Sequence, residues 1–545
     1  MQRGYVNIGT QSEPIQLHFR MQGSGPAVVF LHPSPMSSVS MMPMVKRASD
    51  KVTAIALDTP GYGYSDDLPD AVNDLSPYVH ALDKFRQGLG LETLGLYGSA
   101  TGAQIAIEYA KAYESQCDFI ILDNAADFTD EDRDRITEGY FPDLNVETTG
   151  GHLMRTWGLA LDQLRFFPWH DHSEACRLPA FPIDPDMVQT MVGQFLQAGG
   201  DYDKAYRVAF KNEQAKRLLD VNVSTTVLRW DGSILKKYTD QFDNHDWPSN
   251  FHMQHVPADK RLEGIDEALT RHMEGMASVS VSVPDDKSCA GPRFANLSYG
   301  SVHEVCSGGE GTPWLLLHDL GSSSCAIKPV IQAFAQSHGL LAPDLPGHGA
   351  SDLRLDSDLD FITGSSGVIQ GLLNDYGMKK VNVLAMGEAA ALGIEIGRQT
   401  SSLIGKIVLL NPVQHLKFLS AEPVLDGSHL TTLWHQLKNQ SLFLDIEDMT
   451  PKSALAGDPE LDPKRLNQRV LDLMRSRPAY AHAKASTDAY DIVSCAKEVS
   501  CPLVIARTES TTAGEGSRRS FPTLTDAQLM DLPSDPSDWP ELLQA

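Results

Sequence analysis

The segment that bears most directly on chemistry is Gly98–Gly102, which follows a predicted strand over 93–97. A sharp strand-to-helix turn of the pattern Gly-x-x-x-Gly usually presents a nucleophilic side chain from its central position to a substrate carbonyl. Here the central residue is Ala100, whose methyl group cannot attack a carbonyl carbon. A similar segment, Gly387–Ala391, places Ala389 at its centre. The sequence therefore predicts two such turns, each with alanine in place of the nucleophile.

Self-similarity along the chain predicts a tandem duplication. Six landmarks recur in the same order, and the two members of each pair lie 276 to 289 positions apart. Chance is a poor explanation for six ordered matches at nearly one spacing. The matched pairs are His32 and His318, Asp58 and Asp344, Ala100 and Ala389, His152 and His429, Asp231 and Glu509, and Pro257 and Pro533.

The duplication predicts two domains, over 1–275 and 293–545, joined by a turn-rich linker at 276–292. Each half alternates short Val, Ile and Leu runs with helical stretches. This alternation is typical of an α/β fold with a mostly parallel, doubly wound sheet covered by helices on both faces. A longer insert follows the predicted sixth strand of each half, at about 127–220 and 413–497, and we expect both inserts to form helical caps.

The order and spacing of these landmarks resemble the α/β-hydrolase superfamily over nearly the whole chain. The resemblance rests on the His32 loop, the run Asp58–Asp66 (Asp-Thr-Pro-Gly-Tyr-Gly-Tyr-Ser-Asp) and the turn after it. The first half is similar to bacterial members that carry Gly-x-His-Thr-Gly-Ala at the turn, where this chain reads Gly-Ser-Ala-Thr-Gly-Ala. Ala100 is then either a natural alanine or a replacement of histidine or serine, and the sequence does not separate the two.

The resemblance implies a triad whose acid follows the seventh strand, at Asp231 and Glu509, and whose histidine lies just past the eighth strand. Neither half has a histidine there, and His255 lies two positions too early. A serine-esterase mechanism needs nucleophile, base and acid together. The sequence therefore does not support that mechanism for either half.

The resemblance also implies an oxyanion hole formed by the backbone N–H groups of Thr101 and Ser34, since backbone donors do not depend on the nucleophile. Such a site could hydrolyse an ester, a lactone or a C–C bond of a small, partly apolar carbonyl compound by a non-standard mechanism. It could equally serve a lyase, decarboxylase or isomerase without a covalent nucleophile. A non-catalytic ligand-binding protein is the third alternative.

We expect any activity in the first half, around Ala100, and a structural role for the second half. Each candidate has a structural alternative: His32 could shape its own loop, His152 could begin a cap helix, and Asp231 could bond turn N–H groups. Aromatic residues of the insert would line an apolar pocket. The catalytic candidates are Ala100, Asp231, His152 and His32, the binding candidates are Ser34, Ser99, Thr101, Trp157 and Trp169, and the other aromatic residues are Tyr140, Phe166 and Phe167.

Composition excludes several function classes. A net charge of −26 argues against binding nucleic acid or an anionic membrane. There is no apolar run of membrane-spanning length and no signal-peptide stretch, and the seven cysteines form no Cys-x-x-Cys pair. We therefore expect a cytoplasmic protein with a small-molecule substrate and leave its oligomeric state open. The sequence predicts no cofactor and no metal, since His170-Asp-His172 with Glu174 is a weak pattern in a loop.

Overall fold

The computed structural model describes residues 1–10, 12–69, 72–283, 290–298, 300–414, 416–443, 446–451, 453–454, 461–508, 523–524 and 526–544. The chain forms two compact units. The first comprises Met1–Asn145 and Arg155–Pro284, and the second comprises Val146–Met154 and Asp285–Ala545. Of the predicted linker 276–292, positions 284–289 lie outside the described residues.

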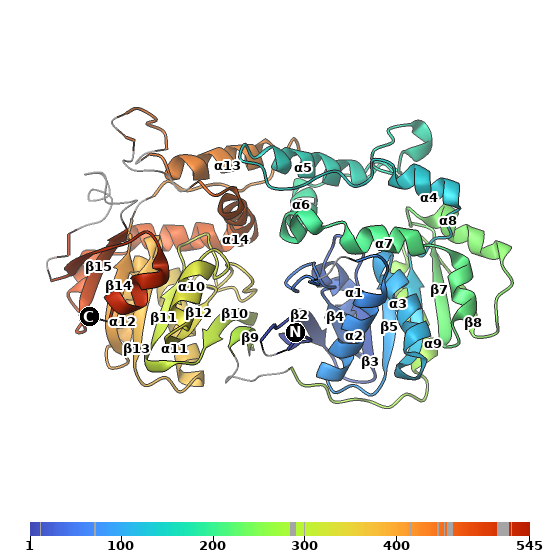
Figure 1. The fold of residues 1–545 in the computed structure, drawn as a ribbon, viewed down its shortest axis with the longest axis horizontal. Coiled ribbons are helices and arrows are strands. Elements are labelled where there is room, and N and C mark those ends of the chain that lie inside the picture. The colour runs from blue at the N-terminus through green and yellow to red at the C-terminus, as the bar shows by residue number, and fades with distance from the viewer. Residues whose placement is uncertain are drawn as a thin grey trace. The chain divides into compact units, whose positions relative to one another are not determined.

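The first unit is built on a sheet of eight strands with helices on both faces (Figure 1). The strand order is β1-β2-β4-β3-β5-β6-β7-β8. Strand β2 runs antiparallel to both of its neighbours, and the other pairs are parallel. The strands are β1 (Gln2–Asn7), β2 (Gln16–Gln22), β3 (Ala27–Leu31), β4 (Thr53–Leu57), β5 (Leu94–Ser99), β6 (Cys117–Asp123), β7 (Ser224–Trp230) and β8 (Phe251–Val256).

Alternation along the buried strands divides the core into two layers. In β3, Val29 and Leu31 pack with helices α2 and α3, whereas Val28 and Phe30 pack with α1 and α9 on the other face. The insert between β6 and β7 is helical and contains α4 to α7, and the first residues of α5, up to Met154, belong to the second unit. The helices from α1 to α9 are α1 (Met42–Ala48), α2 (Ser76–Gly88), α3 (Thr101–Ala112), α4 (Asp130–Thr137), α5 (Gly151–Gln163), α6 (Pro185–Ala198), α7 (Lys204–Asn212), α8 (Lys236–Thr239) and α9 (Arg261–Met273).

The second unit repeats this topology, with its strands in the order β9-β10-β12-β11-β13-β14-β15-β16. The two sheets confirm the predicted fold class and duplication. The strands are β9 (Gly291–Leu297), β10 (Gly300–Ser307), β11 (Glu310–Leu317), β12 (His338–Pro343), β13 (Val381–Met386), β14 (Ile404–Leu410), β15 (Leu503–Thr508) and β16 (Gln528–Leu532). The helices are α10 (Lys328–Ala335), α11 (Phe361–Asp375), α12 (Ala390–Gln399), α13 (Ser428–Gln440), α14 (Pro463–Ala489), α15 (Ile492–Ala496) and α17 (Trp539–Leu542). In the part of the chain that is described, no helix combines the length and the apolar character needed to cross a bilayer.

A buried hydrogen-bond network centred on one aspartate is also duplicated. Asp58 accepts bonds from the Ser38 N–H at 2.6 Å and from His18 Nδ1 at 2.7 Å. Burial opposes ionisation of this carboxyl, but His18 and the hydrogen bonds hold its pKa below the ordinary value. The corresponding residues Asp344, Ser324 and His303 make the same bonds, at 2.6 and 2.9 Å.

The turn before α3 allows a direct test of its packing. A Cβ added at Gly102 would lie 2.2 Å from the carbonyl oxygen of Leu31, whereas one added at Gly158 in α5 would meet no atom within 4 Å. We expect Gly102→Ala to lower the unfolding free energy by about 1–3 kcal/mol, as overpacking does. The matched Gly158→Ala should raise it by about 0.5–1 kcal/mol through helix propensity. Differential scanning calorimetry would check both, and equal midpoints for the two variants would contradict the close packing.

Candidate active site

Ala100 lies between the last residue of β5 and the first residue of α3, with φ 48° and ψ −113°. A non-glycine residue at positive φ is strained and persists only where its surroundings enforce it. The two flanking glycines provide that enforcement. A Cβ at Gly98 would lie 2.3 Å from the carbonyl oxygen of Gly102, and one at Gly102 would meet Leu31. The start of α3 therefore lies directly against β3 and β5, and Ala100 closes the turn.

The methyl side of this turn borders a cavity of about 480 Å³ in the first unit. Its lining is largely apolar and comes from the turn, the loop after β3 and the helical insert. Three of the aromatic residues predicted to line a pocket do so. They are Tyr140, Phe166 and Phe167. The predicted residues Ser34, Ser99, Ala100 and Thr101 also line it.

The backbone N–H groups of the lining residues Ser34 and Thr101 are among those for which the described part of the chain offers no acceptor. Thr101 begins α3, where the first N–H groups of a helix have no partner within the helix. Ser34 lies in the loop after β3, and among the described residues no acceptor is found for its N–H or for that of Thr101. The Thr101 hydroxyl is likewise buried without a hydrogen-bond partner in the described part of the chain. We refer to the N–H groups of Ser34 and Thr101 as the N–H pair.

The prediction that Ala389 occupies the equivalent turn of the second unit is wrong. Leu31 is paired with Gly98 in the first sheet, and Leu317 is paired with Ala385 in the second, so Ala385 corresponds to Gly98. Gly387, two residues after Ala385, therefore corresponds to Ala100, two residues after Gly98. Gly387 has φ 57°, whereas Ala389 has φ −65° and lies at the start of α12. The sequence pattern misleads because Gly387 resembles the first glycine of the motif, although it is the residue at the turn's centre.

In the second unit the equivalent N–H pair is occupied by a side chain of the same unit. Asp319 Oδ1 accepts the N–H of Glu388 at 2.8 Å and the N–H of Leu320 at 2.9 Å. These two donors correspond to Thr101 and Ser34, and Asp319 corresponds to a proline in the first unit. Burial and the Asp319 charge raise the pKa of Glu388 to about 7. The fold thus directs two N–H groups at one carboxylate oxygen.

Arg261, the first residue of α9, follows directly on the segment 256–260, where the resemblance places a catalytic histidine and this chain has none. The guanidinium lines the cavity and donates from Nε to Asp123 Oδ2 at 2.8 Å, with Nη2 2.7 Å from the same oxygen. The Tyr97 hydroxyl donates to that oxygen at 2.6 Å, and Arg261 lies 4.6 Å from the Trp230 ring centroid. Burial opposes the guanidinium charge, but Asp123 and Tyr97 raise the pKa of Arg261. It therefore cannot accept a proton as a base.

Glu213, at the end of α7, is a buried carboxyl on the cavity wall that no sequence motif indicates. Its Oε2 accepts the Ala126 N–H and a bond from Gln104 Nε2, both at 2.9 Å. Burial raises the pKa of this carboxyl well above its ordinary value, and the two bonds only partly oppose the shift. Burial therefore favours the protonated form of Glu213.

His32 does not line the cavity. It is buried, its Nδ1 donates to the carbonyl of Pro33 at 3.0 Å, and its Nε2 accepts the Thr59 N–H at 3.0 Å. Burial lowers the pKa of His32, so the ring is neutral. In the second unit His318 accepts the Leu345 N–H at 3.0 Å. The repeated geometry favours the alternative in which this histidine shapes its loop.

His152 belongs to the second unit rather than to the cavity. Its Nδ1 accepts the Glu147 N–H at 3.2 Å, and its Nε2 lies 2.9 Å from Asn467 Oδ1. His429 repeats the first contact with the Val424 N–H at 3.3 Å. The structure therefore does not bring His152 to the turn, and the bonds favour its alternative role at the start of a helix.

Asp231 is not among the lining residues, although its neighbours Trp230 and Gly232 are. Its Oδ2 is 2.8 Å from His255 Nε2, and the exposed fractions of the two side chains are 35% and 62%. The pair is an acid and a base in contact, but neither residue lines the cavity. Its predicted counterpart, Glu509, lies outside the described residues.

The remaining predicted residues support the cavity in different ways. Ser99 lines it, and its hydroxyl accepts a 3.1 Å bond from Asn124, whose φ is 51°. Trp169 donates from Nε1 to the Tyr140 carbonyl at 2.9 Å and so holds a lining residue in place. Trp157 is fully buried in the helical insert and is not part of the lining.

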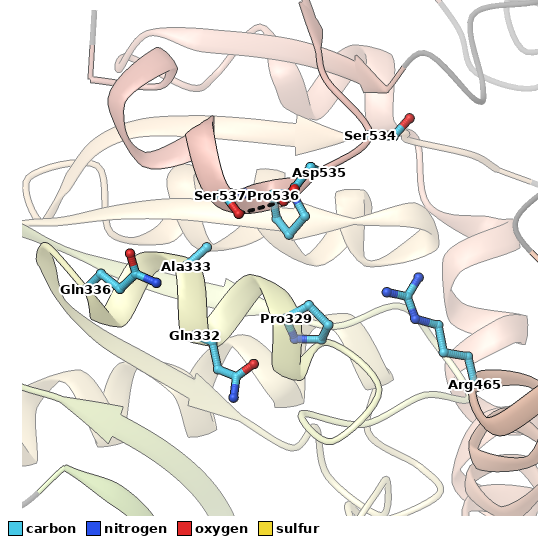
Figure 2. Close-up of a pocket in the computed structure, with 9 residues that line it drawn as sticks. All are labelled: Pro329, Gln332, Ala333, Gln336, Arg465, Ser534, Asp535, Pro536 and Ser537. Atoms are coloured by element: carbon cyan, nitrogen blue, oxygen red, sulfur yellow. Dashed lines mark hydrogen bonds between the residues drawn. The ribbon is translucent and has the colours of Figure 1, made fainter. Parts of the chain in front are cut away.

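The second unit has a hollow of its own, of about 520 Å³, which Figure 2 shows between α10 and the residues before α17. Its lining is polar, with Gln332, Gln336, Arg465 and Ser534–Ser537, and it includes neither Gly387 nor Asp319. It is therefore separate from the turn that matches Ala100.

Across the described ranges, no group of three or more His, Cys, Asp and Glu side chains could hold a metal ion.

Comparison with known proteins concerns the fold of the chain. Residues 26–263 match the family model described as the alpha/beta hydrolase fold. Over 164 residues the chain is 29% identical to (E)-2-((N-methylformamido)methylene)succinate hydrolase of Acinetobacter baylyi, covering 30% of this chain and 57% of that protein. Over 124 residues it is 31% identical to 2-(acetamidomethylene)succinate hydrolase of Mesorhizobium japonicum, covering 23% and 42%. The chain thus spans about half the length of these relatives.

A solved structure of E-2-(acetamidomethylene)succinate hydrolase is 19% identical, covers 49% of this chain and 96% of its own, and has a TM-score of 0.35. The family match over 26–263 and the duplicated strand order show an α/β-hydrolase fold arranged as two tandem α/β domains.

The raised pKa of Glu213 predicts a pH-dependent stability. The folded state holds this proton more tightly than the unfolded chain, whose pKa is about 4.3, so stability falls as pH rises from there to the folded pKa. We expect Glu213→Gln to melt at a higher temperature than the wild type at pH 8 and at nearly the same temperature at pH 4. Thermal melts across this range would check it, with the exposed Glu138→Gln as control. A pH-independent difference would contradict the buried proton.

Proposed function

We propose that the first unit is an enzyme that converts a small, partly apolar carbonyl compound without a covalent nucleophile, and that the second unit is structural. The observation that carries the proposal is the contrast between the two N–H pairs. The pair in the first unit lies on a cavity, whereas its counterpart is occupied by Asp319. Two N–H groups aimed at one oxygen stabilise the negative charge that develops on a carbonyl oxygen during reaction.

The residues at the turn favour a mechanism with no acyl-enzyme. Ala100 offers no nucleophile, and no histidine is among the described residues that line the cavity. A covalent route requires both groups. Among the cavity-lining residues, Glu213 is the carboxyl that can exchange a proton, and the N–H pair supplies the electrostatic stabilisation.

The step we propose is water attack on an ester or lactone. The water oxygen bonds to the carbonyl carbon, and the C=O π electrons move to the oxygen held by the N–H pair. A lone pair of the oxyanion then re-forms the carbonyl, and the bond from the carbonyl carbon to the leaving oxygen breaks. Glu213 gives its proton to that leaving oxygen. The Glu213 carboxylate then takes the proton from the attacking water, which leaves an acid, an alcohol and the original enzyme.

A second candidate uses the same site for enolate chemistry, as in a lyase, decarboxylase or isomerase. It is favoured by the N–H pair, which would stabilise an enolate oxygen as well as a tetrahedral one, and by the lack of a nucleophile at position 100. The names of the two relatives describe hydrolases of amidomethylene succinates, which favours hydrolysis as the first candidate. The ligand-binding alternative predicts binding without conversion of any substrate.

The decisive experiment transfers the internal carboxylate of the second unit to the first. Pro33 occupies the position of Asp319, and a Cβ at Gly387 would lie 2.4 Å from Asp319 Cγ, so the transfer also needs glycine at position 100. The double variant Pro33→Asp with Ala100→Gly should place a carboxylate on the N–H pair, and we expect turnover of 4-nitrophenyl esters and γ-lactones to fall by about 10²-fold or more. The matched control, Pro33→Ala with Ala100→Gly, should keep most of the activity. Full activity in the aspartate variant would contradict the proposal, as would a wild type that binds these compounds and converts none.

A second test concerns the missing nucleophile. Ala100→Ser should not create a serine esterase, because no histidine is among the described residues that line the cavity, so none is there to accept the proton of the hydroxyl. We expect no initial burst of product and no mass increase of the protein after incubation with 4-nitrophenyl acetate. A burst, together with an acyl adduct on the serine, would show that the site lacks only the nucleophilic oxygen at position 100. That result would contradict the non-covalent mechanism.

A further inference from the structure

Arg261 stands out within the cavity of the first unit because its surroundings are apolar. Among the residues that line the cavity, Arg261 and Glu213 are the two with a guanidinium or a carboxyl group, and burial raises the pKa of Glu213, which favours its uncharged form. The chain as a whole carries a net charge of −26. A fixed cation on the wall of an apolar cavity is therefore the main charge that a ligand would meet.

The guanidinium is held in a defined orientation. Asp123, which is completely buried, engages Nε and Nη2 through one oxygen, and the ring of Trp230 lies against the guanidinium. The hydrogen bond and the ion pair that Arg261 makes to Asp123 use Nε and Nη2, and neither of them uses Nη1. Because the planar group is pre-ordered, little conformational entropy is lost when a further acceptor binds.

The geometry points to a carboxylate-bearing ligand: we propose that the substrate of this cavity is a carboxylic acid with an apolar body, whose carboxylate accepts a charge-assisted bond from Arg261 Nη1. Its apolar part would lie among Phe166, Phe167 and Phe210, which also line the cavity. The pairing with Asp123 reduces the net charge of the guanidinium, so we expect moderate affinity rather than tight binding. This rests on the proposed function only in placing the substrate in the cavity.

Binding can be measured without turnover. Isothermal titration of the full chain with linear carboxylates from butanoate to decanoate, and with the matching neutral amides, tests whether charge is recognised. We expect the best carboxylate to bind at least about tenfold more tightly than its amide. Arg261→Gln should abolish that preference, and Arg261→Lys should keep part of it because the charge remains but the planar fork is lost.

The matched control is Arg47→Gln, since Arg47 also bonds an aspartate, Asp266, but lies outside the cavity lining. It should keep the preference for carboxylates. Equal affinities for acid and amide in the wild type, no binding of any carboxylate at millimolar concentration, or a preference that survives in Arg261→Gln would each overturn the inference. Should Arg261→Gln fail to fold by circular dichroism, the acid-to-amide ratios of the wild type and Arg261→Lys still decide the question.

The two proposals fail separately. If carboxylates bind through Arg261 but no ester or lactone is converted, the catalytic proposal is wrong and the ligand class stands. If esters are converted with the same efficiency whether or not they carry a carboxylate, the catalytic proposal stands and the ligand class is wrong.

Discussion

The steric closeness of α3 to β3 and β5 is the constraint on which the site depends. Gly98 and Gly102 have no room for a side chain, so the backbone turns sharply and Ala100 takes a positive φ. This turn leaves the Thr101 N–H without a partner in the helix and brings it to the cavity wall. Because the arrangement belongs to the backbone, it persists although the residue at its centre offers no reactive group.

The two units use this backbone arrangement differently, and a pair of residues accounts for the difference. A Cβ at Gly387 would lie 2.4 Å from Cγ of Asp319, so glycine at the turn and aspartate in the preceding loop require one another. In the first unit the loop position is Pro33, whose ring carries no acceptor, and the turn tolerates alanine. Alanine at position 100 is thus compatible with an accessible N–H pair, whereas an aspartate in the loop would demand a glycine.

The fold could be predicted because it depends on patterns that the sequence displays: alternating buried strands and landmarks repeated at one spacing. The residue at the centre of the second turn could not be predicted, because the motif-like segment Gly387–Ala391 is centred on Ala389, two positions after the true centre, Gly387. The strand-end residues Asn124 and Asn411, both at positive φ, are 287 positions apart and carry the correct spacing. That spacing agrees with the offset between Ala100 and Gly387.

The site was harder to predict because its polar residues come from the ends of helices. Arg261 reaches the cavity because α9 begins there, and Glu213 because α7 ends there, and neither boundary follows from a motif. Residue type alone does not distinguish a histidine that shapes a loop, such as His32, from one that faces a ligand.

The charges around the cavity restrict the chemistry further. Asp123 Oδ2 is bonded to Arg261 and Tyr97, and the cation that it holds can neither accept nor readily release a proton. In the proposed mechanism proton transfer therefore falls to Glu213, whose burial favours the neutral acid. A site with one acid, one fixed cation and two N–H donors can stabilise an oxyanion and protonate a leaving group. It cannot activate a serine, which is why the absence of one at position 100 is consistent with the rest of the cavity.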